Sequence, residues 1–165
     1  MALSVGGVPV AGAGALLGRR VTLTTAAPSR VSPRSHDAPL RLMVSRTRPS
    51  AVALGLAAHC RAVRVPMGSA GAKAMAVVLG EADIYVYASG QYEWDSAVPA
   101  AIATAAGLHV SRIDGTALQY NQADPWLPDL LICCPELGAR TLDALRELSA
   151  RGWASEGSAP QAELP

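Results

Sequence analysis

Apolar residues along the chain fall into short β-prone runs that alternate with longer Ala-rich segments of helical spacing. This alternation predicts an α/β domain in which helices are layered on a sheet. The segments between the runs are rich in Gly, Pro and polar residues, as expected for turns. The expected strands cover residues 40–45, 61–66, 83–88, 108–113 and 130–134, and the expected helices cover 50–60, 70–79, 96–106 and 136–150.

The first 39 residues follow a different pattern. The runs 8–13 and 20–25 are short and β-prone, and the Gly-containing segment between them predicts an antiparallel hairpin. Residues 26–39 contain three Pro and three Ser without periodicity, which indicates a loop. We therefore expect strands in 1–25, a loop in 26–39, the α/β domain in 40–150 and a disordered tail in 151–165.

Near the end of the α/β domain the dipeptide Asp114-Gly115 is typical of a tight turn. This turn is expected to join residues 109–113 to a further strand over 117–120.

The composition indicates a single folded domain. The 165 residues are 50% hydrophobic and 16% charged, with a net charge of +1. This near-neutral charge argues against a nucleic-acid polymer as partner, although residues 1–64 carry nine Arg against one acid and the remainder carries five bases against twelve acids. The asymmetry fits pairing of basic with acidic segments, a phosphate site, or solvated surface.

Other features concern the location of the protein. No apolar run reaches the ~18–20 residues of a membrane span, and the amino terminus lacks the basic region of a signal peptide. The cysteines Cys60, Cys133 and Cys134 form neither a disulfide framework nor a zinc pattern. They are interpreted as free thiols, two of them on a buried strand, which fits a reduced cytoplasmic setting.

The segment Gly68–Lys73 (GSAGAK) is the first candidate for chemistry. It places small residues between a predicted strand and a predicted helix, where backbone N–H groups attract anions. Lys73 is the only lysine, and the spacing is not that of a P-loop. Tight helix–strand packing and ligand binding both explain the segment.

The segment Gln91–Ala97 (QYEWDSA) is the second candidate. Asp95 stands where the N-cap of helix 96–106 is expected. The same carboxylate could instead ligate Mg²⁺, with Trp94 anchoring the turn in the core, but one carboxylate alone does not build a magnesium site.

Together these motifs resemble the inositol monophosphatase superfamily, and most closely its actinobacterial 3′(2′),5′-bisphosphate nucleotidases. The resemblance rests on GSAGAK, EWDSA and the later DGTALQYN, in that order. It implies a layered αβ sandwich of the sugar phosphatase fold, of which the chain supplies the C-terminal half and, in residues 1–25, part of the N-terminal half. It also implies Mg²⁺ and hydrolysis of phosphoadenosine phosphates in sulfur assimilation.

The resemblance also implies residue roles. Asp95 corresponds to the family's metal-binding aspartate, and Gly68, Ser69, Ala70 and Lys73 correspond to its substrate-binding turn. A further substrate-binding residue is expected in residues 45–48 (SRTR), a segment that resembles the family's SRSH. In that segment Arg46 would contact substrate, and an Arg replaces the family's His.

Two family features are absent: the DPLDGT signature and the Glu-Glu pair that supply most metal ligands. The chain is therefore expected to be inactive alone and to self-associate through uncovered apolar surface. Two alternatives remain. One is a phosphatase for inositol phosphates or sugar bisphosphates, although Ala88 stands where such enzymes tend to carry a substrate-binding Glu. The other is a non-catalytic relic or assembly module.

Overall fold

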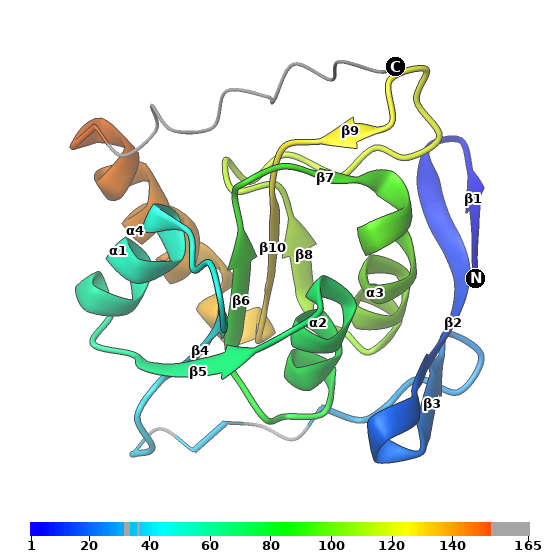
Figure 1. The fold of residues 1–165 in the computed structure, drawn as a ribbon, viewed down its shortest axis with the longest axis horizontal. Coiled ribbons are helices and arrows are strands. Elements are labelled where there is room, and N and C mark those ends of the chain that lie inside the picture. Colours follow the sequence, from blue (N-terminus) through cyan, green and yellow to red (C-terminus); the bar gives the residue numbers. More distant parts are fainter. Residues whose placement is uncertain (32–33, 36, 153–165) are drawn as a thin grey trace.

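A five-stranded mixed sheet with helices on both faces forms the centre of the computed structural model, which describes residues 1–31, 34–35 and 37–152 (Figure 1). The strand order is β5-β4-β6-β10-β8. Strand β4 runs parallel to β5 and β6, whereas β10 runs antiparallel to β6 and β8. The strands are β4 (Arg41–Ser45), β5 (Val63–Met67), β6 (Ile84–Tyr87), β8 (His109–Ser111) and β10 (Leu130–Cys133).

Helices cover the two faces of this sheet in pairs, α1 with α4 and α2 with α3 (Figure 1). Alternating side chains of β4 divide between the two cores: Leu42 and Val44 belong to the core under α1 and α4, whereas Met43 belongs to the core under α2 and α3. The helices are α1 (Ala51–His59), α2 (Ala70–Val78), α3 (Glu93–Ala105) and α4 (Gly138–Ala150).

A second, antiparallel sheet packs on the far side of α3, so that the layers run helix, sheet, helix, sheet (Figure 1). Two glycines of β2 permit this close packing: a Cβ at Gly12 would lie 3.2 Å from the Cβ of Ala101, and one at Gly14 would lie 3.0 Å from a methyl carbon of Val98. The strands are β1 (Ala2–Val5), β2 (Val8–Leu16) and β3 (Val21–Thr24), with a 3₁₀ turn at Leu17–Arg19.

The five expected strands of the central sheet and the four expected helices are confirmed, with shifted ends. Helix α3 begins at Glu93 rather than at residue 96, and residues 135–137 form a 3₁₀ turn before α4. The prediction missed β1, β7 (Gln91–Tyr92) and β9 (Trp126–Leu127). A strand over 117–120 was wrong, and the tail from residue 153 lies outside the described residues.

Ion pairs join arginines of residues 1–64 to acidic residues of the rest of the chain, which is one of the explanations for the charge asymmetry. Arg19 pairs with Glu81, and Arg41 donates to the buried Asp83 at 2.8 Å. The backbone N–H of Arg41 donates to the same carboxylate at 2.7 Å. These contacts tie the start of β4 to the start of β6. No helix of the described residues is long and apolar enough to cross a membrane.

Gly90 provides a test of the turn after β6. Its φ is +73°, and a Cβ there would lie 1.9 Å from a ring carbon of Trp126. Gly80 has nearly the same φ, +72°, with no atom within 4 Å. Gly90→Ala should therefore lower the free energy of unfolding by about 2 kcal/mol more than Gly80→Ala, because both substitutions strain the backbone but only the first forces Trp126 to move.

Urea unfolding of the two variants and the unmodified chain measures this difference. Equal destabilisation by the two substitutions would contradict the packing of Trp126 against Gly90.

Candidate functional site

The candidate site lies at the edge of the central sheet where the parallel strands β4, β5 and β6 end. Arg46 follows β4, and its backbone N–H donates to the carbonyl of Met67, the last residue of β5, at 3.1 Å. The next residue, Gly68, lies against the Arg46 guanidinium: a Cβ there would lie 3.2 Å from its nitrogen. The structure thus brings two predicted site residues into contact at the strand ends.

The turn after Gly68 begins α2. Ser69 has a positive φ of 63°, and its hydroxyl oxygen accepts a hydrogen bond from the N–H of Ala72 at 3.3 Å. Ala70 is the first residue of the helix. The expected strand–turn–helix arrangement of GSAGAK is therefore confirmed.

Lys73 lies one turn inside α2 and is 4% exposed, although it carries an ammonium group. Its nitrogen lies 5.5 Å from the ring centroid of Tyr85 on β6. Among the described residues it forms no ion pair. Burial lowers the pKa of Lys73, so an anion that reached this nitrogen would meet a cation with weak hydration.

Tyr85 connects this lysine to the second predicted motif. Its hydroxyl is buried and makes no hydrogen bond to a described residue. Burial raises the pKa of Tyr85, and the neighbouring Tyr87 and the charge of Asp95 raise it further. Asp95 is on α3 and Lys73 is on α2, and the two helices pack together on the face of the sheet that holds the Tyr85 side chain. Sequence reasoning missed Tyr85, because a tyrosine in an apolar strand is typical of a core.

Asp95 is in the first turn of α3 and is exposed. The N-cap is Tyr92 rather than Asp95, and the Asp95 carboxylate accepts a hydrogen bond from the Tyr92 N–H at 3.3 Å. The expected anchoring of Trp94 in the core was wrong. Trp94 is 65% exposed and stacks on Tyr92, with ring centroids 4.5 Å apart, because the helix starts early and turns this side chain outward.

Three contacts fix the start of α3. The carboxylate of Glu93 accepts hydrogen bonds from the backbone N–H groups of Asn121 and Gln122, at 2.6 and 3.0 Å. The hydroxyl of Tyr120 donates to that of Ser96 at 3.2 Å, both groups being buried. No local sequence pattern predicts these contacts.

The described residues contain no group of three or more His, Cys, Asp or Glu that could hold a metal ion. Mg²⁺ prefers six oxygen ligands in octahedral geometry. Asp95 can supply one carboxylate, so the described residues do not by themselves fit a magnesium site.

A cavity of about 740 Å³ opens at the same edge of the sheet but over its other face, between the start of α1 and the end of α4. Arg48, the residue that replaces the family's His, lines it together with Ala88, but Lys73 and Asp95 do not. Because the buried lysine and the Asp95 carboxylate are on α2 and α3, the candidate site lies on the α2 and α3 side of this edge.

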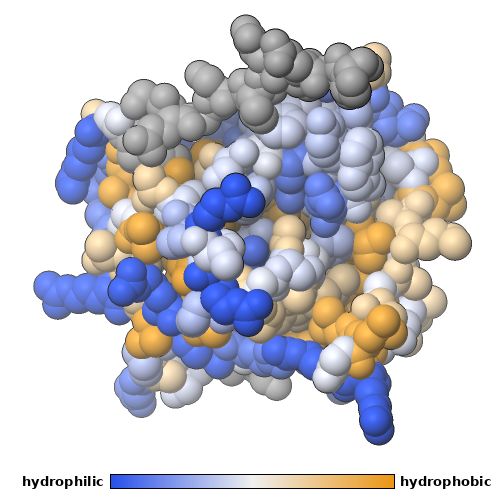
Figure 2. Space-filling view, in the orientation of Figure 1, coloured by the Kyte–Doolittle hydropathy of each residue, from blue (hydrophilic) through white to orange (hydrophobic). Residues whose placement is uncertain are grey.

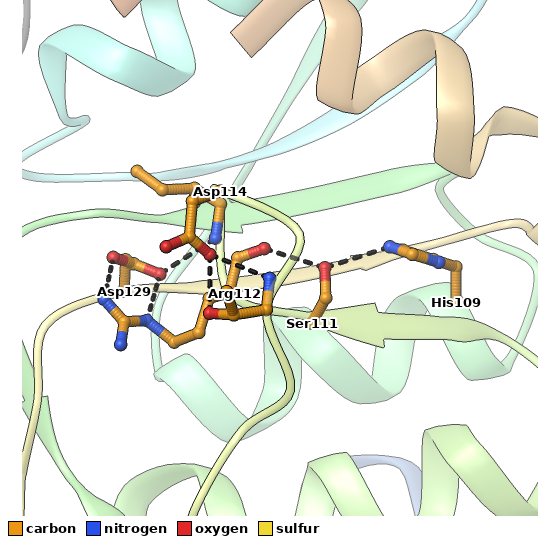
Figure 3. Close-up of polar contacts among 7 residues, drawn as sticks. His109, Ser111, Arg112, Asp114 and Asp129 are labelled. Atoms are coloured by element: carbon orange, nitrogen blue, oxygen red, sulfur yellow. Dashed lines mark hydrogen bonds and ion pairs between the residues drawn. The ribbon is translucent and has the colours of Figure 1, made fainter. Parts of the chain in front are cut away.

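A polar cluster begins in β8 and continues after it (Figure 3). His109 Nε2 lies 2.9 Å from the Ser111 hydroxyl, which itself donates to the carbonyl of Arg112 at 2.7 Å. Arg112 makes two hydrogen bonds to the carboxylate of Asp129. Ser111 is 3% exposed. The carboxylate of the cluster, that of Asp129, accepts from Arg112 and not from His109. The cluster is therefore not a Ser-His-Asp triad.

The turn beside this cluster agrees with the sequence prediction. The Asp114 carboxylate accepts hydrogen bonds from the N–H and the hydroxyl of Thr116, at 2.8 and 2.6 Å. These bonds lower the pKa of Asp114. Gly115 adopts a φ of +91°, as a tight turn requires.

The cysteines take no part in the candidate site. Within the described residues all three are free. Burial raises the pKa of Cys133 to about 12 and that of Cys134 to about 11. Both therefore stay protonated thiols near neutral pH.

Comparison with known proteins points to one family. A sequence profile of the Inositol monophosphatase family matches residues 5–149. A Mycobacterium tuberculosis protein named 3′-phosphoadenosine 5′-phosphate phosphatase is 47% identical over 130 residues, which cover 79% of this chain and 49% of that protein. A Mycobacterium leprae protein of the same name is 48% identical over 109 residues, or 66% and 40% of the two chains. The chain spans about half the length of these curated relatives or less.

Solved structures agree in fold. CysQ from Bacteroides thetaiotaomicron, a bacterial member of the inositol monophosphatase family, has a TM-score of 0.69 at 20% identity, over 81% of this chain and 61% of that one. Inositol monophosphatase from Anabaena has a TM-score of 0.70 at 20% identity, over 90% and 64%.

Replacing Lys73 tests whether burial of its charge lowers stability. Lys73→Met should raise the free energy of unfolding at pH 7 by about 1 kcal/mol, because it removes a buried charge that has no acidic partner among the described residues. Burial lowers the pKa of Lys73 below its usual 10.5. As the pH rises toward 10.5, the folded state loses this proton before the unfolded state does, so the original chain gains stability and the difference shrinks.

Urea unfolding at pH 7 and pH 9.5 checks both signs, with Lys73→Arg as the control that keeps the charge. A variant that is less stable than the original at pH 7, or a difference that does not change with pH, would contradict the burial of an unpaired ammonium group.

Proposed function

Since the chain belongs to the inositol monophosphatase family and has its αβ fold, we propose that it supplies the substrate-binding face of a Mg²⁺-dependent phosphomonoesterase of the 3′(2′),5′-bisphosphate nucleotidase type. The proposed substrate is a small phosphorylated nucleotide, namely a phosphoadenosine phosphate. The names of the mycobacterial relatives support this substrate class. The observation that carries the proposal is Lys73, which is buried without an ion-pair partner among the described residues, one turn inside the helix that follows Gly68, and on the same face of the sheet as Asp95.

The proposed roles follow from the chemistry of each group. The backbone of Gly68, Ser69 and Ala70 approaches the ribose or a phosphate, because small residues at a helix start leave N–H groups accessible. Lys73 and Arg46 neutralise phosphate charge, Arg46 from the exposed side and Lys73 from the buried side. Asp95 supplies one carboxylate to Mg²⁺.

The phosphatase alternative for inositol phosphates or sugar bisphosphates uses the same strand-end site. The methyl side chain of Ala88 follows β6 and offers no acceptor for sugar hydroxyls. This favours the nucleotide substrate. The family, sulfur assimilation and the free, protonated cysteines together support a cytoplasmic location as part of the proposal.

A second candidate is a non-catalytic binding or assembly module. It is favoured by one observation, the absence of a metal-binding cluster from the described residues. Lys73 and Arg46 of such a module would still bind a phosphorylated nucleotide, and Mg²⁺ would not change the affinity. When the chain is fused to the part of the Mycobacterium tuberculosis relative that it does not match, dependence of nucleotide binding on Mg²⁺ distinguishes the two candidates.

The chain alone should bind Mg²⁺ weakly, with a dissociation constant in the millimolar range or above, and should not release phosphate from 3′-phosphoadenosine 5′-phosphate, because a single carboxylate cannot complete the coordination. Fusion of the chain behind the part of the Mycobacterium tuberculosis relative that it does not match should restore activity. In that fusion Asp95→Asn should lower the rate at least about a hundredfold, with little loss of stability, since an amide oxygen can still accept from Tyr92.

Phosphate release and thermal unfolding measure these effects, and Asp143→Asn is the matched control, at an exposed ion pair remote from the site. Robust Mg²⁺-dependent turnover by the 165 residues alone, or an unchanged rate in the Asp95→Asn fusion, would overturn the proposed role of Asp95.

The isolated chain should also self-associate, because large apolar side chains of β1 and β2 are exposed. Val10→Asp should reduce this association. Val63→Asp is a matched control on β5, since Val10 and Val63 are 52% and 51% exposed. Sedimentation velocity over a concentration series measures the effect. A clean monomer at every concentration, or equal effects of the two substitutions, would contradict the prediction.

A further inference from the structure

A small cavity lies at the edge of the central sheet opposite to the candidate site. The parallel strands β4 and β6 begin at this edge, and the antiparallel β10 ends there. The cavity has a volume of about 340 Å³, which is room for about ten water molecules at roughly 30 Å³ each. Among the described residues, the polar side chains that line it are those of Arg34, Ser35, Arg41, Asp83 and Cys134.

The carboxylate of Asp83 is the buried anion of this cavity, and Arg41 uses both of its oxygens. Asp83 lies directly before β6 and is 1% exposed. The backbone N–H of Arg41 donates to it at 2.7 Å, and the Arg41 guanidinium donates at 2.8 and 3.3 Å. These hydrogen bonds raise the pKa of Arg41. One guanidinium in contact with one carboxylate neutralises it, so Asp83 has little attraction left for a second cation.

Arg34 is that second cation. Its Nε lies 3.6 Å from Oδ2 of Asp83, which is longer than a hydrogen bond. The same nitrogen is buried and makes no hydrogen bond to a described residue. The side chain is 13% exposed, and its other polar contact is with the carbonyl of Ala38. Because burial of an incompletely paired guanidinium lowers stability, this arrangement favours an additional anionic partner.

The other polar groups of the cavity do not repel an anion. Burial raises the pKa of Cys134 to about 11, so its thiol is uncharged near neutral pH. The hydroxyl of Ser35 can donate a hydrogen bond. Arg34, Arg41 and Asp83 together carry one net positive charge.

The surroundings of the cavity are also basic. Residues 1–64 carry nine arginines against one acid, and such an excess attracts anions. In Figure 2, strongly hydrophilic side chains project from the lower part of the molecule, which is the side where Figure 1 shows the segment between β3 and β4. Arg34 belongs to this segment.

We infer that the cavity binds a tetrahedral oxyanion, phosphate or sulfate, between the guanidinium groups of Arg34 and Arg41. A guanidinium presents two parallel N–H donors that match two oxygens of such an anion. The anion can be a free ion or the terminal group of a larger ligand. The site is formed where the strands begin, whereas Arg46 and Gly68 follow strand ends, so the inference does not rest on the proposed function.

Binding at this place would also hold the segment before β4. The described residues between Thr24 and Arg41 form no helix or strand. A single backbone hydrogen bond, from the N–H of Ala38 to the carbonyl of Ser35 at 3.3 Å, links two residues of the segment itself. An anion that contacts both Arg34 and Arg41 would join the segment to the start of β4.

The test is calorimetric titration with sodium phosphate, compared with sodium chloride of equal ionic strength. The starting chain carries Lys73→Met and Arg46→Gln, which removes the two cations of the candidate site. One phosphate is expected to bind per chain. Arg34→Gln should then weaken binding about tenfold or more, because it removes a charged donor. Arg30→Gln should leave binding within about twofold, since Arg30 is exposed in the same segment and does not line the cavity.

Hydrogen exchange in the unmodified chain locates the site and keeps the test valid if Arg34→Gln does not fold. At a phosphate concentration ten times the dissociation constant, the backbone amides of Ala38 and Arg41 should exchange about tenfold more slowly, because opening of this region must release the anion. Chloride of equal ionic strength should not slow them. Unchanged exchange of both amides would overturn the inference.

Two further ligands identify the source of the anion. If sulfate binds as well as phosphate and adenosine 5′-phosphate binds more weakly, the site takes a free ion. If adenosine 5′-phosphate binds more tightly, and Arg34→Gln removes this binding, the site takes a terminal phosphate group. Either result supports the inference.

The remaining outcomes contradict it. No phosphate signal above that of chloride in the Lys73→Met, Arg46→Gln chain would show that the cavity binds no oxyanion. Equal weakening by Arg34→Gln and Arg30→Gln would show that phosphate responds only to the overall charge of the segment. Both outcomes would leave the proposed function of the candidate site intact.

Discussion

The close contact between β2 and α3 is the constraint on which the rest of the structure depends. Helix α3 lies between two sheets, and it can lie against the second only because Gly12 and Gly14 have no side chains in its way. Larger residues there would push the second sheet outward. The same contact fixes the direction of α3, and therefore the place of its first turn, which holds Asp95. Packing at the middle of the helix thus sets the geometry of the site at its start.

This arrangement gives the second sheet two apolar faces, one packed and one open. Alternation of side chains explains how both can occur in one strand: β2 changes its pattern of exposure at Ala11–Gly12, next to an irregularity in its pairing with β1. Before that point the outward side chains are Val8 and Val10. After it, the inward residues are Gly12, Gly14 and Leu16.

The sequence predicted the central sheet because its strands and helices are separated by clear turns, and it predicted the turn before α2 because small residues at a helix start are a local signal. It missed the length of β2, because Gly12 and Gly14 lower the strand propensity of this segment. Glycine is needed at both positions because β2 packs closely on α3, which is a contact that the sequence alone does not reveal. It placed the start of α3 at the wrong residue, because Asp95 looks like an N-cap, whereas the contacts of Glu93 with Asn121 and Gln122 begin the helix earlier. Those contacts join residues 28 and 29 positions apart and leave no local pattern.

The buried lysine and the exposed carboxylate lie in different electrostatic environments. Lys73 lies buried on the ring of Tyr85, and the ring keeps the ammonium group in place without neutralising its charge. The Tyr85 hydroxyl is also buried without a partner among the described residues. Burying an unpaired ammonium group and an unpaired hydroxyl lowers the stability of the folded chain. An anionic ligand can neutralise the charge of Lys73, and burial strengthens the attraction between the two charges. Asp95, by contrast, is exposed and alone, and a carboxylate near a phosphate repels it until cations intervene. The described residues therefore combine a buried cation that an anionic ligand can neutralise with one exposed carboxylate and no metal-binding cluster.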